Sequence, residues 1–226
     1  MDSLAAFWQT LVAPASAALG QGAQTLDLPA LLALAAALGW ASGLRLYAVL
    51  FMTGLAGLLG WIALPQGLHV LQHPAMLVAS GGMLSVEFLA DKIPGLDSLW
   101  DMVHAVIRVP GGAALAAAVF GADNTTMAVV AGVLGGSLAA TSYAGKATTR
   151  AAVNTSPEPF SNVAVSLLED GLVVAALWLA VQHPLLFAVA LTITLVLTVL
   201  LIAVLFKFLR AIVRRLTAWF SPSPVY

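Results

Sequence analysis

Long apolar runs dominate this sequence and restrict its fold more than any other feature. A helix needs about 20 mostly apolar residues to cross the hydrocarbon of a bilayer. Runs of this kind lie at about 28–43, 45–64, 74–91, 110–121, 126–145, 160–182 and 185–206. Charged residues make up only 8% of the chain, against roughly 25% in soluble domains. We therefore predict an all-α polytopic membrane protein, a transmembrane bundle of about seven helices in the lipid bilayer.

The first two runs form one apolar stretch that is interrupted only at Ser42–Arg45. A single helix of that length would overshoot the bilayer, and an arginine at its centre would be costly. A tight turn near Gly43 resolves both problems. This turn is predicted to place Arg45 at a membrane surface.

Basic residues fall on one side of the membrane when these spans alternate in direction. That side holds all nine of them: Arg45, Lys92, Arg108, Lys146, Arg150, Lys207, Arg210, Arg214 and Arg215. The opposite side, with residues 1–27, 65–73, 122–125 and 183–184, holds none. Because cytoplasmic loops are enriched in Lys and Arg, we expect a cytoplasmic C-terminus and an external N-terminus. The expected location is a bacterial inner membrane.

Three regions follow from this topology. Residues 1–27 are predicted to form an external segment that is a candidate for an interfacial helix, and residues 28–206 are predicted to form the transmembrane domain. Residues 207–226 form a basic cytoplasmic tail that is suited to anionic lipid headgroups. Nothing else basic accompanies this tail, so nucleic acid is not an expected partner. The chain has no cysteine, which excludes disulfides and thiol chemistry.

One cytoplasmic segment combines charge with helical spacing. Asp97, Asp101, His104 and Arg108 follow one another at i, i+4, i+7 and i+11 and therefore share a helix face. The pattern predicts an amphipathic helix over 95–109, which Pro110–Gly112 should end before the short span 110–121. Interrupted helices are a pointer to transporter sites, although they also occur as simple bends, and both interpretations stay open.

Weak internal similarity suggests a repeat of three helices in each half. Short matches recur at shifts of 96 and 110 residues: Leu38–Gly39 with Leu134–Gly135, Tyr47 with Tyr143, and Gln72–Pro74 with Gln182–Pro184. The shifts disagree, so a duplication would require gaps.

Carboxylates inside apolar spans are the main candidates for a functional site. Such groups are costly in hydrocarbon unless they face a cavity or pair with a base. We predict a cytoplasm-facing polar pocket whose binding residues are Glu87, Asp91, Glu169, Asp170, Arg45, Lys92, Lys146 and Arg150. A secondary polar face comprises Asp97, Asp101, Arg108, Asn154, Glu158 and Asn162. The alternative is a set of salt bridges between helices without a ligand.

The polar stretches also carry a family resemblance. They are Ala41–Arg45, Glu87–Pro94, Asp97, Trp100, Asp101, Ile107–Arg108, Gly145–Ala147, Arg150, Asn154, Ser156–Asn162 and Glu169–Asp170. From about residue 30 to 185 the chain resembles a bacterial integral-membrane family known as a domain of unknown function (4126). The resemblance implies a shared membrane fold and cytoplasmic polar face, but no activity. Tyr143 lies near a position where the family has histidine, which weakens any role for a histidine there.

A transporter or channel for a small ion or polar solute is the function we favour from the sequence. A membrane-embedded enzyme is an alternative, because the pairs Glu87/Asp91 and Asp97/Asp101 could hold Mg²⁺ for a phosphorylated or lipid substrate. No nucleophile stands out, so we expect no catalytic residue and no cofactor beyond such a cation. A structural or assembly protein is the third alternative, since glycine runs at 54–60 and 132–136 suit close helix contacts, including those of a homo-oligomer.

Overall fold

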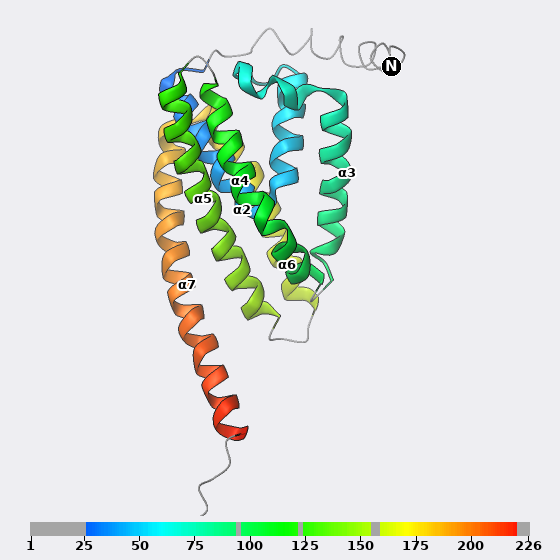
Figure 1. The fold of residues 1–226 in the computed structure, drawn as a ribbon, viewed down its shortest axis with the longest axis vertical. Helices are drawn as coiled ribbons and strands as arrows, with labels where there is room; N and C mark the ends of the chain where they lie inside the picture. Colours follow the sequence, from blue (N-terminus) through cyan, green and yellow to red (C-terminus); the bar gives the residue numbers. More distant parts are fainter. Residues whose placement is uncertain (1–25, 94–95, 122–123, 155–158, 221–226) are drawn as a thin grey trace, which may run out of the picture.

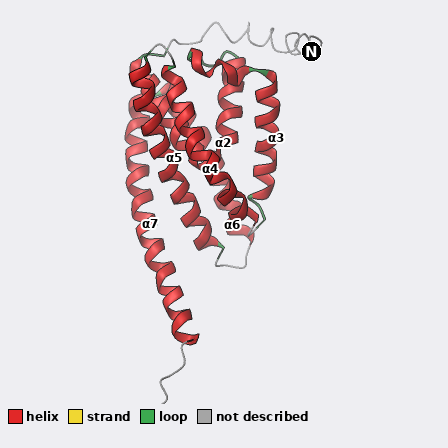
Figure 2. Cartoon of the chain, in the orientation of Figure 1, coloured by secondary structure: helices red, strands yellow, loops and turns green. Residues whose placement is uncertain are grey.

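The structure, a computed structural model, describes residues 26–93, 96–121, 124–154 and 159–220. This part of the chain is helical and contains no strand (Figure 2). Its elements are α2 (Leu28–Leu58), the 3₁₀ helix η2 (Gln66–Gln72), α3 (Pro74–Ala90), α4 (Leu96–Phe120), α5 (Thr125–Val153), α6 (Pro159–Gln182) and α7 (Pro184–Phe220). The prediction of an all-α bundle is confirmed.

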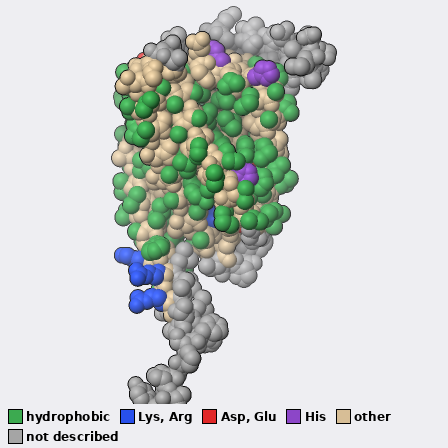
Figure 3. All heavy atoms as spheres, viewed as in Figure 1, with side chains coloured by type: hydrophobic (Ala, Val, Ile, Leu, Met, Phe, Trp, Pro, Cys, Tyr) green, Lys and Arg blue, Asp and Glu red, His purple; other side chains and the backbone are tan. Residues whose placement is uncertain are grey.

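The helices have the length and surface of membrane spans. α2, α4, α5, α6 and residues 184–208 of α7 are each long and apolar enough to cross a bilayer, and α3 is a shorter apolar helix. Apolar side chains cover the visible face of the bundle, and basic ones gather near the lower end of α7 (Figure 3). The protein is therefore a polytopic integral membrane protein. The interfacial helix expected within residues 1–27 lies almost entirely outside the described residues.

Helix α2 folds back on itself at Arg45 and so supplies two helical arms. The backbone of Arg45 is not helical, with φ −148° and ψ 82°. Leu34 of the first arm lines the same cavity as Met52 and Thr53 of the second, so the arms lie side by side. In Figure 1 the first arm runs down from the top of the bundle and the second returns beside α3. The two arms together with α3–α7 make seven helical passes, as the sequence predicted.

The position of Arg45 corrects one prediction. We expected this arginine at a membrane surface, but its side chain is fully buried inside the bundle. The first arm, residues 28–44, is only about 25 Å long at 1.5 Å per residue, which is shorter than the roughly 30 Å of hydrocarbon. The turn therefore lies inside the bundle, where carboxylates from other helices replace the water that a surface would provide.

Helix α4 corrects a second prediction. Instead of an amphipathic helix over 95–109 that ends at Pro110, one helix continues through Pro110 to Phe120. Proline removes one backbone hydrogen bond, which a packed membrane helix tolerates when its neighbours hold it in place. Gly112 lies against α2 and α5, where an added Cβ would be 2.9 Å from the Cβ of Ala139 and 3.1 Å from the carbonyl oxygen of Gly39.

Helices α2 and α5 cross in close backbone contact. A Cβ added to Gly39 would lie 2.5 Å from the Cα of Gly135, so this crossing needs glycine. One turn further along α2, Gly43 faces Ala139 and Ser142 in the same way. The Ser142 hydroxyl donates a hydrogen bond to the carbonyl oxygen of Trp40 at 2.6 Å. Small residues at such crossings allow the close packing that holds membrane helices together.

Candidate functional site

Ten charged side chains from α2, the α3–α4 region, α5 and α6 meet inside the bundle. Six are acidic and four are basic, and a continuous chain of ion pairs connects them. This charged cluster consists of Arg45, Glu87, Asp91, Asp97, Asp101, Arg108, Lys146, Arg150, Glu169 and Asp170. All are buried except Asp170, whose side chain is 28% exposed.

Arg45 reaches three neighbours from the break in α2. Its Nη2 lies 2.8 Å from Oδ2 of Asp91, which follows α3, and its Nε lies 2.9 Å from Oδ1 of Asp170 on α6. Nη2 also donates to the Ser166 hydroxyl at 2.8 Å. The break makes a main-chain acceptor available as well, since the Leu44 carbonyl oxygen accepts a hydrogen bond from Nζ of Lys146 at 3.1 Å.

Two bases on α5 bridge the remaining helices. Nζ of Lys146 lies 3.1 Å from Oδ1 of Asp101, 3.3 Å from Oε2 of Glu169 and 3.5 Å from Oδ2 of Asp91. Arg150 lies one turn later, with Nη2 3.1 Å from Oε2 of Glu169. Each base thus faces several carboxylates at similar distances.

Arg108 of α4 is shared by two carboxylates. Its Nη2 lies 2.5 Å from Oε1 of Glu87, and its Nη1 lies 2.6 Å from Oδ1 of Asp101. The second oxygens of these two carboxylates, Oε2 of Glu87 and Oδ2 of Asp101, are buried without a hydrogen-bond partner among the described residues. Buried polar atoms usually find partners. Both oxygens of Asp91 also lack a hydrogen bond among the described residues, but three bases face that carboxylate.

The structure unites the two sets of residues that the sequence kept apart. Asp97, Asp101, Arg108 and Asn162, predicted as a secondary face, belong to the same polar region as Arg45 and Glu169. This is a correction, and its reason is that α4 continues into the bundle beside α5 instead of ending at Pro110. Asn154 joins through its amide, which donates to Asp97 at 3.2 Å. The expected site residue Glu158 lies outside the described residues.

Lys92 is a predicted binding residue that lies near the cluster, within electrostatic reach of Asp170. Its Nζ lies 2.9 Å from the ring centroid of Phe88 and donates to the Phe88 carbonyl oxygen at 3.3 Å. Desolvation lowers the pKa of the Lys92 ammonium group, and the nearby Asp170 carboxylate acts in the opposite direction. That any of these residues binds a substrate or ion stays a prediction.

Several polar neighbours were not singled out from the sequence. Ser166 binds Arg45, and the Ser98 hydroxyl accepts a hydrogen bond from Asn154 at 2.9 Å. The spacing of Asn162, Ser166 and Glu169 places them on one face of α6, and this helical periodicity was a usable signal. No comparable pattern pointed to Ser98.

The cluster is more closed than the predicted polar pocket. Its side chains fill the space between the helices, and Asp170 lies at its margin. Asp170 also lines a cavity of about 490 Å³ between α2, α3 and α6, together with apolar residues such as Met52, Leu84 and Phe88. Leu89 of α3, which also lines this cavity, is exposed.

The carboxylate pairs that could hold Mg²⁺ face protein cations instead. Glu87 pairs with Arg108, Asp91 with Arg45, and Asp101 with both Arg108 and Lys146. Among the described residues, no three His, Cys, Asp or Glu side chains are arranged to hold a metal ion.

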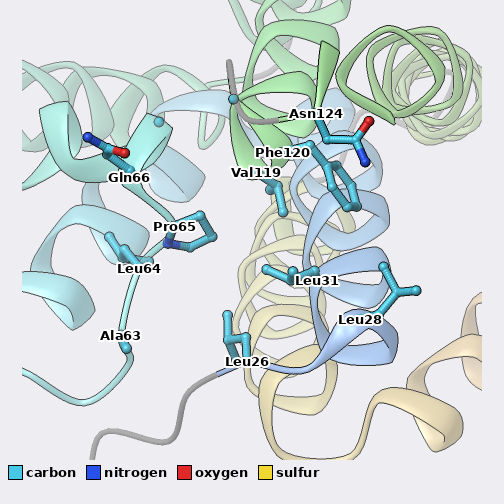
Figure 4. A pocket seen from close by; sticks show the side chains of 12 residues that line it. Leu26, Leu28, Leu31, Ala63, Leu64, Pro65, Gln66, Val119, Phe120 and Asn124 are labelled. Carbon is cyan, nitrogen blue, oxygen red and sulfur yellow. The ribbon is translucent and has the colours of Figure 1, made fainter. Parts of the chain in front are cut away.

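A second cavity, of about 860 Å³, lies at the opposite end of α4 (Figure 4). Its wall is mostly apolar, with Leu28 and Leu31 of α2 facing Leu64, Pro65 and Phe120. Gln66 and Asn124 add polar groups at this end.

Comparison with known protein families assigns this chain to one of them. Residues 32–204, well over half of the chain, match the model of a domain of unknown function (DUF4126), so the protein belongs to that family. The chain has no significant match among curated proteins or among solved structures. The family membership confirms the resemblance seen in the polar stretches of the sequence.

Proposed function

We propose that this member of the DUF4126 family moves a small ion or polar solute across the membrane, with the charged cluster as its binding site. The observation that carries the proposal is the break of α2 at Arg45, in the middle of the cluster. Broken helices release main-chain polar groups inside a bundle, and such breaks recur at the ion and substrate sites of transporters.

The energetic cost of the cluster supports a role beyond stability. Buried ion pairs can often be replaced by apolar residues without loss of stability, because desolvation offsets their attraction. Ionisable groups in membrane helices accordingly mark ion and substrate pathways. A purely structural bundle of this length would not need ten of them in one connected cluster.

The geometry of the cluster supports exchange between ionic partners. Glu169 lies 3.1 Å from Arg150 and 3.3 Å from Lys146, and Arg45 lies 3.9 Å away. Small side-chain shifts would therefore trade one partner for another without leaving a charge unpaired. A passing ion or polar solute could be accommodated by the same shifts.

Flux through reconstituted vesicles tests this proposal. Glu87→Gln and Glu169→Gln should each lower the flux of the transported species at least about 10-fold, since each removes an ionisable carboxyl group and leaves the shape of the side chain nearly unchanged. Asp27→Asn is the matched control, because Asp27 caps α2 at the other end of the bundle and asparagine caps equally well. Unchanged flux of every tested solute in both folded Gln variants would contradict the proposal.

We also propose the orientation that the basic residues indicate, with the end of α7 in the cytoplasm of the cell. The chain contains no cysteine, so single-cysteine variants need no further changes. A membrane-impermeant thiol reagent added to intact cells should label Gln66→Cys, on η2, and spare Arg210→Cys, on α7. The reverse labelling pattern would show the opposite orientation.

A further inference from the structure

We infer that the charged cluster holds a proton at neutral pH, and that Glu87, in the pair formed with Asp101 around Arg108, is the group that carries it. The binding of this proton stands on its own evidence. Its use as the transported or coupling ion rests on the function proposed above.

The first argument is the balance of charge. The cluster contains six acidic and four basic side chains, which leaves two negative charges in excess if all are ionised. If Lys92, which lies near the cluster, is counted as a further positive charge, one negative charge in excess remains. Lys207 and Arg210 are exposed on α7 and are not among the bases that pair with the cluster. Uncompensated charge is strongly unfavourable in a low-dielectric interior, and such groups neutralise by taking up a proton.

The second argument is the state of individual oxygen atoms. Oε2 of Glu87 and Oδ2 of Asp101 are buried and lack hydrogen-bond partners among the described residues, while their other oxygens share Arg108. Two carboxylates that share a site do not both ionise easily, so one of them retains a proton. Asp101 has a second base, Lys146 at 3.1 Å, whereas the ion pair of Glu87 is with Arg108. The proton is therefore more stable on Glu87.

A metal ion fits this position less well than a proton. A divalent cation needs several oxygen ligands around one point, and no such group of three is present among the described residues. The first oxygens of Glu87 and Asp101 are already occupied by Arg108. A proton needs only one oxygen.

Charged and titratable groups on every packed element set the environment of Glu87. They are Arg45 and Tyr47 on α2, Asp91 after α3, Asp97, Asp101, His104 and Arg108 on α4, Tyr143, Lys146 and Arg150 on α5, and Glu169 and Asp170 on α6. Asp170 is the member at the cavity between α2, α3 and α6. Arg45 joins it to Asp91, and Lys146 joins Asp91 to Asp101, so ion pairs lead from this cavity to the Glu87 pair.

Infrared spectroscopy of the purified protein in detergent tests the inference. A protonated carboxyl group has its own carbonyl absorption, which shifts when H₂O is exchanged for D₂O. At neutral pH the wild-type protein should show this band. Glu87→Gln should lose nearly all of it, while Glu169→Gln and the distant control Asp27→Asn should keep it.

Two results would overturn the inference. If the band is absent from the wild type at neutral pH, the cluster holds no proton. If the band persists in Glu87→Gln and disappears in Asp170→Asn, the proton is not on Glu87. Neither result depends on flux, so each can be told apart from a failure of the proposed transport function.

A flux experiment tests separately whether transport is coupled to the movement of protons. In wild-type vesicles, imposing a pH gradient should change the initial flux of the transported species several-fold. In vesicles with Glu87→Gln, the gradient should no longer change this flux. If the flux through wild-type vesicles continues but does not respond to the pH gradient, proton coupling is overturned while transport itself stands. Absence of any flux, with the infrared band present, would contradict the proposed function and leave proton binding standing.

Discussion

Two parts of this bundle use the same helices in opposite ways. In one part, α2 and α5 cross through Gly39 and Gly135, in backbone contact and without charge. In the other part, further along both helices, α2 and α5 carry Arg45, Lys146 and Arg150, which meet the carboxylate that follows α3 and carboxylates of α4 and α6. The glycine crossing is an apolar contact of fixed shape, whereas the charged cluster offers several alternative pairings.

This difference distinguishes the contacts that stabilise the fold from the charged residues that form the candidate binding site. Close packing of small residues gains van der Waals contact without desolvating any charge, so the crossing adds stability at little cost. An ion pair in the interior must first overcome the desolvation of both partners. We therefore expect the crossing to set the helix arrangement, and the cluster to be tolerated because of what it binds.

Removing a base from the cluster should have the largest effect on stability. Arg108→Leu would remove the base that Glu87 and Asp101 share and would make the net charge of the cluster more negative by one. Breaking one side of a buried pair costs about 3–5 kcal/mol. The free energy of unfolding in detergent, from denaturant titration, should fall by this amount.

The matched controls for this change are Arg210→Leu and a double variant. Arg210 is exposed on α7, so its replacement should change the free energy of unfolding by less than about 0.5 kcal/mol. Glu87→Leu combined with Arg108→Leu removes both partners of one pair and should be more stable than Arg108→Leu alone. If the double variant is less stable than the single one, the ion pair itself is not the source of the loss.

Filling the glycine crossing should have the next largest effect. Gly39→Leu places a side chain where Cβ already lies 2.5 Å from the Cα of Gly135, so α2 and α5 must separate. Overpacking of this kind costs typically about 1–3 kcal/mol. Thermal unfolding in detergent should show the loss, while Gly82→Leu on α3, where the space is open, should not. Equal behaviour of the two variants would refute the close crossing.

A single hydrogen bond at the crossing should have the smallest effect. Ser142→Ala removes the bond from α5 to the Trp40 carbonyl oxygen of α2. Interhelical hydrogen bonds in membrane proteins contribute about 0.6 kcal/mol on average. The control is Ser137→Ala, since the Ser137 hydroxyl donates its hydrogen bond within α5, to the Val133 carbonyl oxygen at 2.8 Å. A difference between the two variants measures the interhelical bond directly.

Periodicity and composition were enough to predict most of the architecture. The apolar runs located the helices because hydrocarbon demands uninterrupted backbone hydrogen bonding, and the turn near Gly43 followed from the length of the first run. The same logic failed at Pro110, because local propensity favours a break there, whereas α4 is continuous and packs against α2 and α5 at Gly112.

The sequence predicted the residues of the candidate site but not their arrangement in space. Spacing placed Asp97, Asp101 and Arg108 on one face, yet nothing in the sequence indicated that this face meets Arg45 and Glu169. Contacts between residues far apart in the chain depend on how helices cross, and a single sequence carries little information on that.

What the sequence alone determined is the membrane class of this protein, the number of helical passes and the list of ionisable groups that hydrocarbon would not tolerate alone. The tertiary structure decided that Arg45 is buried at a turn inside the bundle, that one charged cluster replaces two polar faces, and that its acids outnumber its bases. The physical reason is that burial and ion pairing are properties of the packed helices, and these arise only when the helices cross.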